Sequence, residues 1–344
     1  RILILDEPTA VLTDDEADRL LGTVHGLARS GTAVILVTHK MADVKTYADR
    51  VTIMRGGRTI QTVDPTQAST AELVKLTVGE TMQPPARAVR QTGAVQLRLR
   101  DLKIALHGKV RDRAGIDLEV RAGEIYGIAG VGGNGQSELA AAIMGLDANE
   151  MCSGEIHCSG LGDIAAQPAA RRRDASIATV PADRYATGLA GSLSVAENFG
   201  IGAAHQGAFG SIWRLHKAKM AAAAHAAVHA FNVQGVRSIW QKAALLSGGN
   251  AQKLVLAREF SKQPVLVLAH SPSRGLDARA TTEVHARLLA ARDAGSAVLL
   301  ISEDLDEVLS LADRIGVMAR GQIVGEFAQP ADRQAIGRAM VDHA

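Results

Sequence analysis

An internal repeat is the feature that most constrains the fold of this chain of 344 residues. The stretch "ILILDEPTA", which starts at residue 2, returns as "LVLAHSPSR" at residue 266. Matching residues, such as Pro8 with Pro272 and Gly31 with Gly295, differ by 264 positions over a segment of about 45 residues. The two copies therefore align without a gap and should share one fold.

Each copy has the same order of predicted elements. An apolar strand ends in a loop that contains proline, an amphipathic helix follows, and a glycine turn leads into a second apolar strand, "AVILVT" or "AVLLIS". Runs of β-branched residues and leucine that alternate with helices are typical of parallel strands buried on both faces. The pattern predicts an α/β fold with a parallel sheet covered by helices.

The two copies differ in what precedes them. The second copy follows about 175 residues that begin near "VQLRLRDL", whereas the first copy begins the chain in mid-strand and without methionine. We expect residues 1–80 to be the C-terminal part of one domain whose upstream part is missing. Residues 95–344 should form a complete second domain. The proline-containing stretch 81–94, "TMQPPARAVRQTGA", is expected to be a linker.

Composition excludes several classes of protein. The formal net charge of +2 is too small to favour a nucleic-acid partner, and no apolar run approaches the ~18 residues of a membrane-spanning helix. Cys152 and Cys158 are too few for a disulfide framework. With His157 they would supply only three ligands, where structural zinc needs four, so we interpret them as small buried side chains.

The segment "GVGGNGQSEL", residues 130–139, nearly matches the phosphate-binding loop G-x-x-x-x-G-K-[ST]. Gly130, Gly133, Gly135 and Ser137 fit such a loop, but Gln136 replaces the lysine. The missing lysine removes a charge-assisted contact of about 1.5–3 kcal/mol. Glycine amides and the following helix N-terminus still attract phosphate. We therefore predict weak nucleotide binding without turnover.

The same glycines permit a second interpretation. Gly130, Gly132 and Gly135 also satisfy G-x-G-x-x-G, and Glu155 lies 20 residues beyond Gly135. A dinucleotide-binding oxidoreductase would have both features. This alternative leaves the internal repeat unexplained.

Acidic residues follow the first strand of the first copy. Asp6 and Glu7 end that strand, where α/β sheets place their ligand sites, and His39 follows the next strand. Asp6 could hold Mg²⁺ through its water shell, and Glu7 could orient or deprotonate an attacking water. His39 could contact a transferring phosphoryl group.

The second copy lacks this acidic chemistry. The matching positions hold His270, Ser271 and Glu303. Together with Gln136, these changes indicate that this half of the chain has given up hydrolysis.

The segment "LLSGGNAQKLVLARE", residues 245–259, supplies another candidate site. Ser247, Gly248 and Gly249 precede a predicted helix. A serine hydroxyl and glycine amides at a helix N-terminus form a cradle for an anion, although an ordinary N-cap turn has the same residues.

Together these motifs resemble the ATP-binding-cassette (ABC) ATPases. Tandem "DEPTAVLT", "GNGQSEL", "LSGGNAQK" and "LLISEDLDEV" look like the ATP-binding subunits of simple-sugar and nucleoside importers, which contain two fused cassettes. The resemblance implies a P-loop NTPase cassette fold, a mostly parallel sheet with flanking helices plus an antiparallel β subdomain and a helical subdomain. It implies ATP and Mg²⁺ as cofactors.

The resemblance also implies partners and a location. Such a subunit drives two membrane permease subunits, fed by a periplasmic or lipoprotein solute-binding protein, at the cytoplasmic face of the bacterial inner membrane. No nucleic acid is expected as a partner. A soluble cassette protein acting on ribosomes or DNA remains an alternative, which the near-neutral charge disfavours.

In the family each ATP lies between the P-loop of one cassette and the LSGG signature of the other. By resemblance, Glu7 and His39 would be catalytic and Asp6 would bind metal, opposite the signature residues 247–249 of the second cassette. Gly130, Gly133, Gly135, Gln136 and Ser137 would form the second, degenerate nucleotide site, with Ser137 as its metal ligand.

Other family positions follow by the same resemblance. Ala182 stands where the family has a magnesium-contacting glutamine, and residues 183–199 would face a permease. Residues 10–13 and 274–277 match loops that cross between cassettes. No clear adenine-stacking aromatic occurs between residues 100 and 115.

Overall fold

The computed structural model describes most of the chain, in two compact units. The first unit is Arg1–Ala86 with Asp277–Thr282, and the second is Arg87–Leu276 with Glu283–Ala344. The residues that the structure describes are 1–6, 8–9, 14–38, 40–55, 58–70, 72–73, 76, 92–106, 114–146, 152–174, 176–204, 207–211 and 214–342. Within them, no helix combines the length and apolar character needed to cross a bilayer. Most of the predicted linker, residues 81–91, lies outside the described residues.

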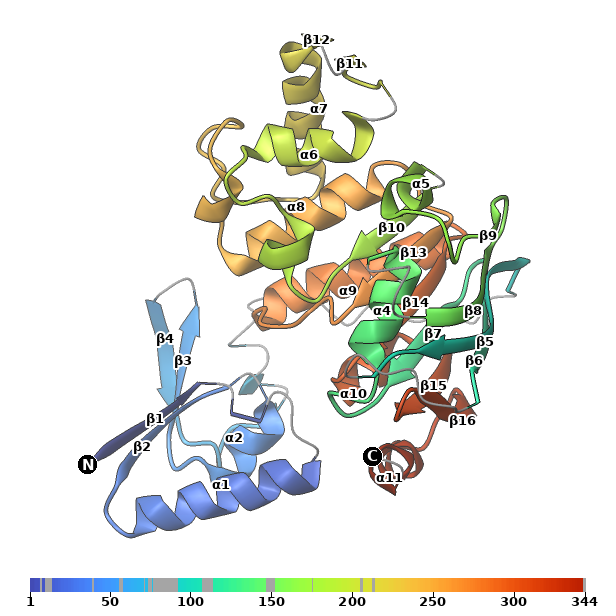
Figure 1. The fold of residues 1–344 in the computed structure, drawn as a ribbon. Coiled ribbons are helices and arrows are strands. Elements are labelled where there is room, and N and C mark those ends of the chain that lie inside the picture. The colour runs from blue at the N-terminus through green and yellow to red at the C-terminus, as the bar shows by residue number, and fades with distance from the viewer. Residues whose placement is uncertain are drawn as a thin grey trace. The chain divides into compact units, whose positions relative to one another are not determined.

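The first unit contains two small sheets (Figure 1). Strands β1 (Ile2–Asp6) and β2 (Ala33–Val37) pair in parallel, and β3 (Val51–Arg55) pairs antiparallel with β4 (Arg58–Val63). Helices α1 (Asp14–Arg29) and α2 (Met41–Tyr47) precede β2 and β3. Val44, Ile53 and Leu73 form a small buried core.

A six-stranded sheet organises the second unit. Its spatial order is β10-β13-β14-β7-β15-β16, in which the first five strands run parallel and only β16 runs antiparallel. The bounds are β7 (Ile125–Ala129), β10 (Ile177–Val180), β13 (Leu266–His270), β14 (Ala297–Ser302), β15 (Arg314–Ala319) and β16 (Gln322–Ala328). The five parallel strands are largely apolar and almost fully buried, because both faces of this part of the sheet are covered.

An antiparallel sheet packs beside this one and shares a core with it. Its order is β6-β5-β8-β9, built from β5 (Val95–Ile104), β6 (Ile116–Arg121), β8 (Cys152–Cys158) and β9 (Gly162–Asp163). Helix α4 (Gln136–Met144) contacts strands of both sheets, and their apolar side chains form one cluster. Cys158 is part of this core, which confirms its interpretation as a small buried side chain.

Helices form a separate part of the second unit, above the main sheet in Figure 1. Helices α6 (Val195–Ala204), α7 (Lys217–Ala230) and α8 (Gly248–Phe260) pack together around their own apolar core, and α8 also contacts β10. The remaining elements are α5 (Ala169–Asp174), α9 (Ala278–Asp293), α10 (Leu305–Leu311), α11 (Arg333–Asp342), β11 (Gly210–Ser211), β12 (Arg214–Leu215), a π-helix (Arg184–Gly188) and a 3₁₀ turn (Ala243–Leu245). The described residues therefore adopt the expected fold class.

The two copies of the repeat fold into the same succession of elements. Helices α1 and α9 each have 16 residues and keep the offset of 264 positions at both ends. The strand registers also agree, because Ile2 pairs with Ala33 in the first copy and Leu266 pairs with Ala297 in the second.

The two copies differ in burial, which corrects one expectation. In β1 the side chains of Ile2 and Ile4 are 73% and 65% exposed, whereas the matching Leu266 and Leu268 are fully buried. Strand β13 lies between β10 and β14 and contacts α4, whereas β1 pairs only with β2 among the described residues. The prediction of a fully buried strand in the first copy is therefore wrong for this structure.

Candidate nucleotide site

The glycine-rich loop joins the buried strand β7 to helix α4, as the motif requires. Gly133 has φ 87°, and Gly135, the N-cap of α4, has φ 109°. A Cβ on Gly135 would lie 2.9 Å from Ile104 Cδ1 and 3.0 Å from Met318 Cε. Both the backbone conformation and the lack of space therefore select glycine. The loop delivers the unpaired amides at the start of α4 to a partly open surface, where an anion could bind.

Gln136 does not extend out of this loop. Its side chain is 2% exposed, and Nε2 donates a hydrogen bond of 3.0 Å to the carbonyl oxygen of Val131. A Cβ on Gly130 would lie 2.4 Å from the same Nε2, so the bare glycine makes room for the amide. Oε1 is buried without a hydrogen-bond partner among the described residues. Gln136 thus fills space beneath the loop and supplies no positive charge to it.

Asn134 holds the loop against the end of strand β15. Its Nδ2 donates to the Val131 carbonyl at 3.0 Å, and its Oδ1 accepts from the backbone amide of Arg320 at 2.9 Å. The amide of Gly321 donates to the carbonyl of Asn134 at 2.8 Å. These bonds fix the loop without using the exposed Ser137, whose side chain remains accessible.

A carboxylate lies against the loop on its open side. A Cβ on Gly132 would lie 2.9 Å from Glu303 Oε1, so this oxygen lies close to the loop backbone. Glu303 occupies the position of His39 in the repeat. A negative charge here opposes phosphate binding, whereas a histidine would not. The structure thus brings together two of the predicted changes, Gln136 and Glu303.

His270 replaces the first acidic residue of the repeat at the end of β13. Burial is the main cause that lowers the pKa of His270 to about 4, and the charge of Arg274 lowers it further. The imidazole is therefore neutral at pH 7 and provides no negative charge for magnesium. No cluster of three or more His, Cys, Asp or Glu residues suited to a metal occurs in the described part of the chain.

The signature residues begin helix α8. Ser247 is the N-cap, and its hydroxyl accepts a hydrogen bond of 2.9 Å from Asn250 Nδ2 and makes no bond to the helix amides. Ser247 is exposed, and Gly248 and Gly249 are partly exposed. The first amides of α8 therefore remain open to a ligand, as an anion cradle requires.

Sequence reasoning missed Arg184 beside the signature. A Cβ on Gly248 would lie 2.6 Å from Arg184 Nη2, and Nη1 donates to the carbonyl of Arg274 at 2.8 Å. The neighbouring Tyr185 hydroxyl donates to the carbonyl of Leu246 at 2.7 Å. A cation at this helix N-terminus would strengthen attraction for a phosphate. The sequence shows this arginine in "ADRY", but its contact with residue 248 follows only from the fold.

Among the candidate site residues predicted for the first unit, Asp6 lies within the described residues. Asp6 ends β1, is exposed, and is opposite Val37 in the parallel register. Glu7, His39 and residues 10–13 lie outside the described residues. Thr9 Oγ1 donates to Asp43 Oδ2 at 2.7 Å, and Lys40 Nζ donates to the carbonyl of Thr9 at 2.8 Å. Asp6 is therefore at a strand end, as predicted.

The dinucleotide-binding alternative fails on Glu155. This residue lies in β8 of the antiparallel sheet, where its Oε2 is 3.0 Å from His157 Nε2. A Rossmann fold would place that acid at the end of the next parallel strand. The G-x-G-x-x-G match is therefore incidental.

Comparison with known proteins agrees with this geometry. The family model described as "ABC transporter" matches residues 114–274. A nucleoside import ATP-binding protein of Lactococcus lactis subsp. cremoris is 39% identical over 342 residues, which cover 99% of this chain and 67% of the relative. The chain belongs to the ABC transporter family.

Other ABC relatives have similar coverage. A glucose import ATP-binding protein of Haloferax volcanii is 41% identical over 342 residues, covering 98% of this chain and 62% of the relative. A guanosine import ATP-binding protein of Bacillus subtilis is 36% identical over 341 residues, covering 98% of this chain and 66% of the relative. The chain thus spans about two thirds or less of the length of these relatives.

Solved ABC structures share the fold. A nucleotide-free ATP-binding cassette matches with a TM-score of 0.56 at 22% identity, covering 70% of this chain and 94% of that one. A dimeric cassette bound to ADP and phosphate matches with a TM-score of 0.55 at 20% identity, covering 67% and 98%. This chain therefore has the ABC-cassette fold.

Proposed function

We propose that this chain belongs to the ATP-binding, ATP-hydrolysing subunit that energises an ABC importer for a nucleoside or simple sugar. Residues 1–80 correspond to the C-terminal part of one cassette, and residues 95–344 form a second, degenerate cassette. The second cassette does not hydrolyse ATP. It contributes its signature, Ser247 to Gly249, to the ATP site of the first cassette, where Glu7 and His39 act with a magnesium ion held at Asp6.

One contrast within the second unit carries this proposal. The signature at α8 keeps an accessible serine, open helix amides and a nearby cation, Arg184. The glycine-rich loop has Gln136 folded beneath it and Glu303 beside it. A unit that binds phosphate poorly at its own loop but keeps its signature is suited to completing the site of another cassette.

The residues around the glycine-rich loop of the second unit are better suited to binding a nucleotide than to binding the Mg²⁺ that accompanies it. The amides at the start of α4 and the exposed Ser137 could hold phosphate, and Ser137 could contact Mg²⁺. No carboxylate stands at the position of His270 to complete a magnesium site. Magnesium and ATP would supply hydrolytic chemistry only where Asp6 and Glu7 are present.

The proposed partners are two membrane permease subunits, with a periplasmic or lipoprotein solute-binding protein acting through them. The relatives' names support a permease, because they describe import ATP-binding proteins. Large apolar side chains are also exposed on the segment expected to face it, at Tyr185, Leu193 and the nearby Ile201. The subunit would then lie at the cytoplasmic face of the bacterial inner membrane.

The solute is proposed only as a class. The relatives are named for glucose, nucleosides, guanosine and ribose. Cassettes contact the permease and not the solute, so residues of this chain do not choose among these compounds.

The test is ATP hydrolysis by the native protein, purified from its own cells with its permease. Ser247→Arg places a bulky cation in the signature of the degenerate unit, and activity should collapse. Ser159→Arg makes the same change in an exposed turn of the antiparallel sheet and should leave activity unchanged. Full activity in Ser247→Arg would refute the proposal that the second cassette contributes its signature to the ATP site of the first.

A further inference from the structure

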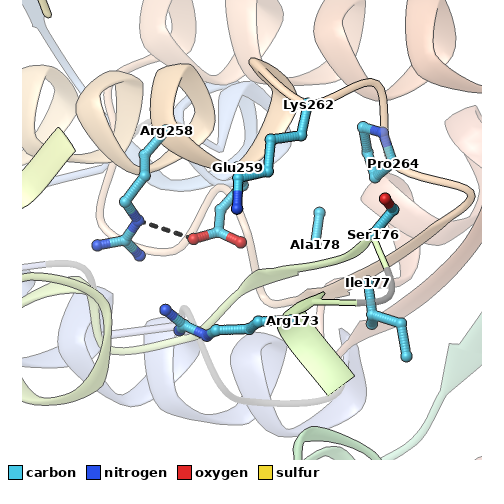
Figure 2. Close-up of a pocket in the computed structure, with 8 residues that line it drawn as sticks. All are labelled: Arg173, Ser176, Ile177, Ala178, Arg258, Glu259, Lys262 and Pro264. Carbon is cyan, nitrogen blue, oxygen red and sulfur yellow. Dashed lines mark hydrogen bonds and ion pairs between the residues drawn. The ribbon is translucent and has the colours of Figure 1, made fainter. Parts of the chain in front are cut away.

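A cationic pocket lies at the end of α8 remote from the signature. Figure 2 shows its lining, which comes from the last turn of α8, the end of α5, the start of β10 and the segment before β13. The space within it, counted with the solvent at its open side, is about 330 Å³. The charged lining residues are Arg173, Arg258, Glu259 and Lys262.

Arg258 is the buried member of this group. Its side chain is 5% exposed, and its Nε donates to Glu259 Oε1 at 2.7 Å. Its Nη2 is buried and has no hydrogen-bond partner among the described residues. A buried donor on a charged group is costly to leave unpaired, and folded proteins rarely do so. Arg258, which lines the pocket, therefore carries a donor with no acceptor in the described part of the chain.

Glu259 cannot balance the charge of the pocket. Arg173 and Arg258 line the pocket with a single described carboxylate, and Figure 2 shows Arg258 joined to that carboxylate of Glu259. The oxygens of Glu259 are already engaged, Oε1 by Arg258 and Oε2 by the backbone amide of Thr179 at 3.1 Å. Both oxygens of the described carboxylate are thus in use, and neither is available to the buried Nη2 of Arg258.

The helix dipole explains only part of this clustering of basic side chains. Arg173 and Arg258 lie in the last turns of α5 and α8, where basic side chains complement the helix dipole. That effect explains their presence but leaves Nη2 of Arg258 without an acceptor. Guanidinium groups bind tetrahedral oxyanions with paired, charge-assisted hydrogen bonds, so two of them beside one pocket favour such a ligand.

We propose that this pocket binds a phosphoryl oxyanion, either inorganic phosphate or the phosphate group of a small organic ligand. Arg173 also lines a neighbouring hollow of about 420 Å³ with apolar side chains that include Met144 and Leu146. An organic phosphate would place its apolar body there. Binding in this pocket would not depend on the proposed transport role.

The experiment follows the Arg258 Nε–H signal by NMR in the whole chain labelled with ¹⁵N-arginine. Inorganic phosphate and phenyl phosphate are each titrated, with sodium chloride at equal ionic strength as the reference. We expect a saturable shift with phosphate that chloride does not produce. Tighter binding of phenyl phosphate would assign the site to organic phosphates, and equal binding would assign it to the free anion.

Matched variants locate the binding. Arg173→Gln should weaken phosphate binding about tenfold, or about 1.4 kcal/mol. Arg171→Gln, an exposed change on the same helix, should leave the dissociation constant unaltered. Phosphate bound at the glycine-rich loop would not depend on Arg173, so the variants separate the two sites. Two results would overturn the proposal: a phosphate-induced shift equal to that with chloride, or a dissociation constant that Arg173→Gln does not change. Either would mean that only water accepts the hydrogen bond from Arg258.

Discussion

Gln136 Nε2 lies 3.0 Å from the carbonyl oxygen of Val131 and donates a hydrogen bond to it. This bond turns the side chain at the lysine position of the P-loop back onto the loop itself. Gly130 permits it, because a Cβ there would lie 2.4 Å from Nε2. The loop therefore offers its backbone amides without a cationic side chain at position 136.

Replacing this glutamine should restore nucleotide affinity. Gln136→Lys supplies a charge-assisted contact worth about 1.5–3 kcal/mol, so ATP should bind roughly ten- to a hundredfold more tightly. The measurement is titration of the chain with a fluorescent ATP analogue. Gln334→Lys adds the same charge on the exposed surface of α11 and should have little effect. Equal affinities for wild type and Gln136→Lys would contradict the assigned role of position 136.

The carboxylate of Glu303 should be a second cause of weak binding. Glu303→Gln removes a negative charge beside Gly132, and ATP affinity should rise by about three- to tenfold, with a smaller gain at high salt. Affinity measured at two ionic strengths tests this effect. Glu155→Gln changes the net charge equally in the antiparallel sheet and serves as the control. A gain of the same size in both variants would show only a general charge effect.

Much of the fold was predictable because local patterns repeat. The offset between "ILILDEP" and "LVLAHSP" predicted matching strands, and Ile2 and Leu266 indeed pair with equivalent partners. The burial of these strands was not predictable from the pattern. An apolar run indicates that a strand can be buried. The side chains of β13 are in fact buried because β10, β14 and α4 pack against this strand.

The candidate site was predictable as a set of positions but not as a set of contacts. Spacing identified Gln136, Glu303 and Ser247, since each stands at a fixed place in a motif. It did not reveal that Gln136 folds under the loop. Nor did it bring Arg184 to Gly248, because that approach depends on how distant segments pack.

Arg184 and Gly248 should be energetically coupled. A Cβ on Gly248 would lie 2.6 Å from Arg184 Nη2, so Gly248→Ala should destabilise the chain when Arg184 is present. In the Arg184→Ala background the same change should stabilise it by about 0.5–1 kcal/mol, since alanine suits a helix better than glycine. Urea unfolding of the four proteins gives the coupling free energy.

Gly337 provides the control for this cycle. It lies in α11 with nothing within 4 Å of an added Cβ. Gly337→Ala should stabilise the chain equally with and without Arg184. A coupling near zero for Gly248 would show that the guanidinium moves aside freely.

His270 should make stability depend on pH. Its pKa falls from 6.5 to about 4 in the folded chain, so the unfolded chain binds a proton first as the pH drops. The stabilisation is present above pH 6.5 and is lost as the pH falls towards 4, by on the order of 3 kcal/mol in total. Unfolding free energies of wild type and His270→Gln at pH 7, 6 and 5 test this. Parallel pH curves for the two proteins would exclude His270 as the cause.

We propose that hydrolysis occurs only where Asp6, Glu7 and His39 stand. The most direct test compares ATP turnover and ATP binding in the native protein, purified from its own cells, with those of Glu7→Gln, using Glu155→Gln as the control. Loss of a catalytic carboxylate typically costs at least about a hundredfold in rate. We expect turnover to fall by that factor in Glu7→Gln while ATP still binds. Turnover near half of wild type would show that the second unit also hydrolyses ATP, and would contradict this proposal.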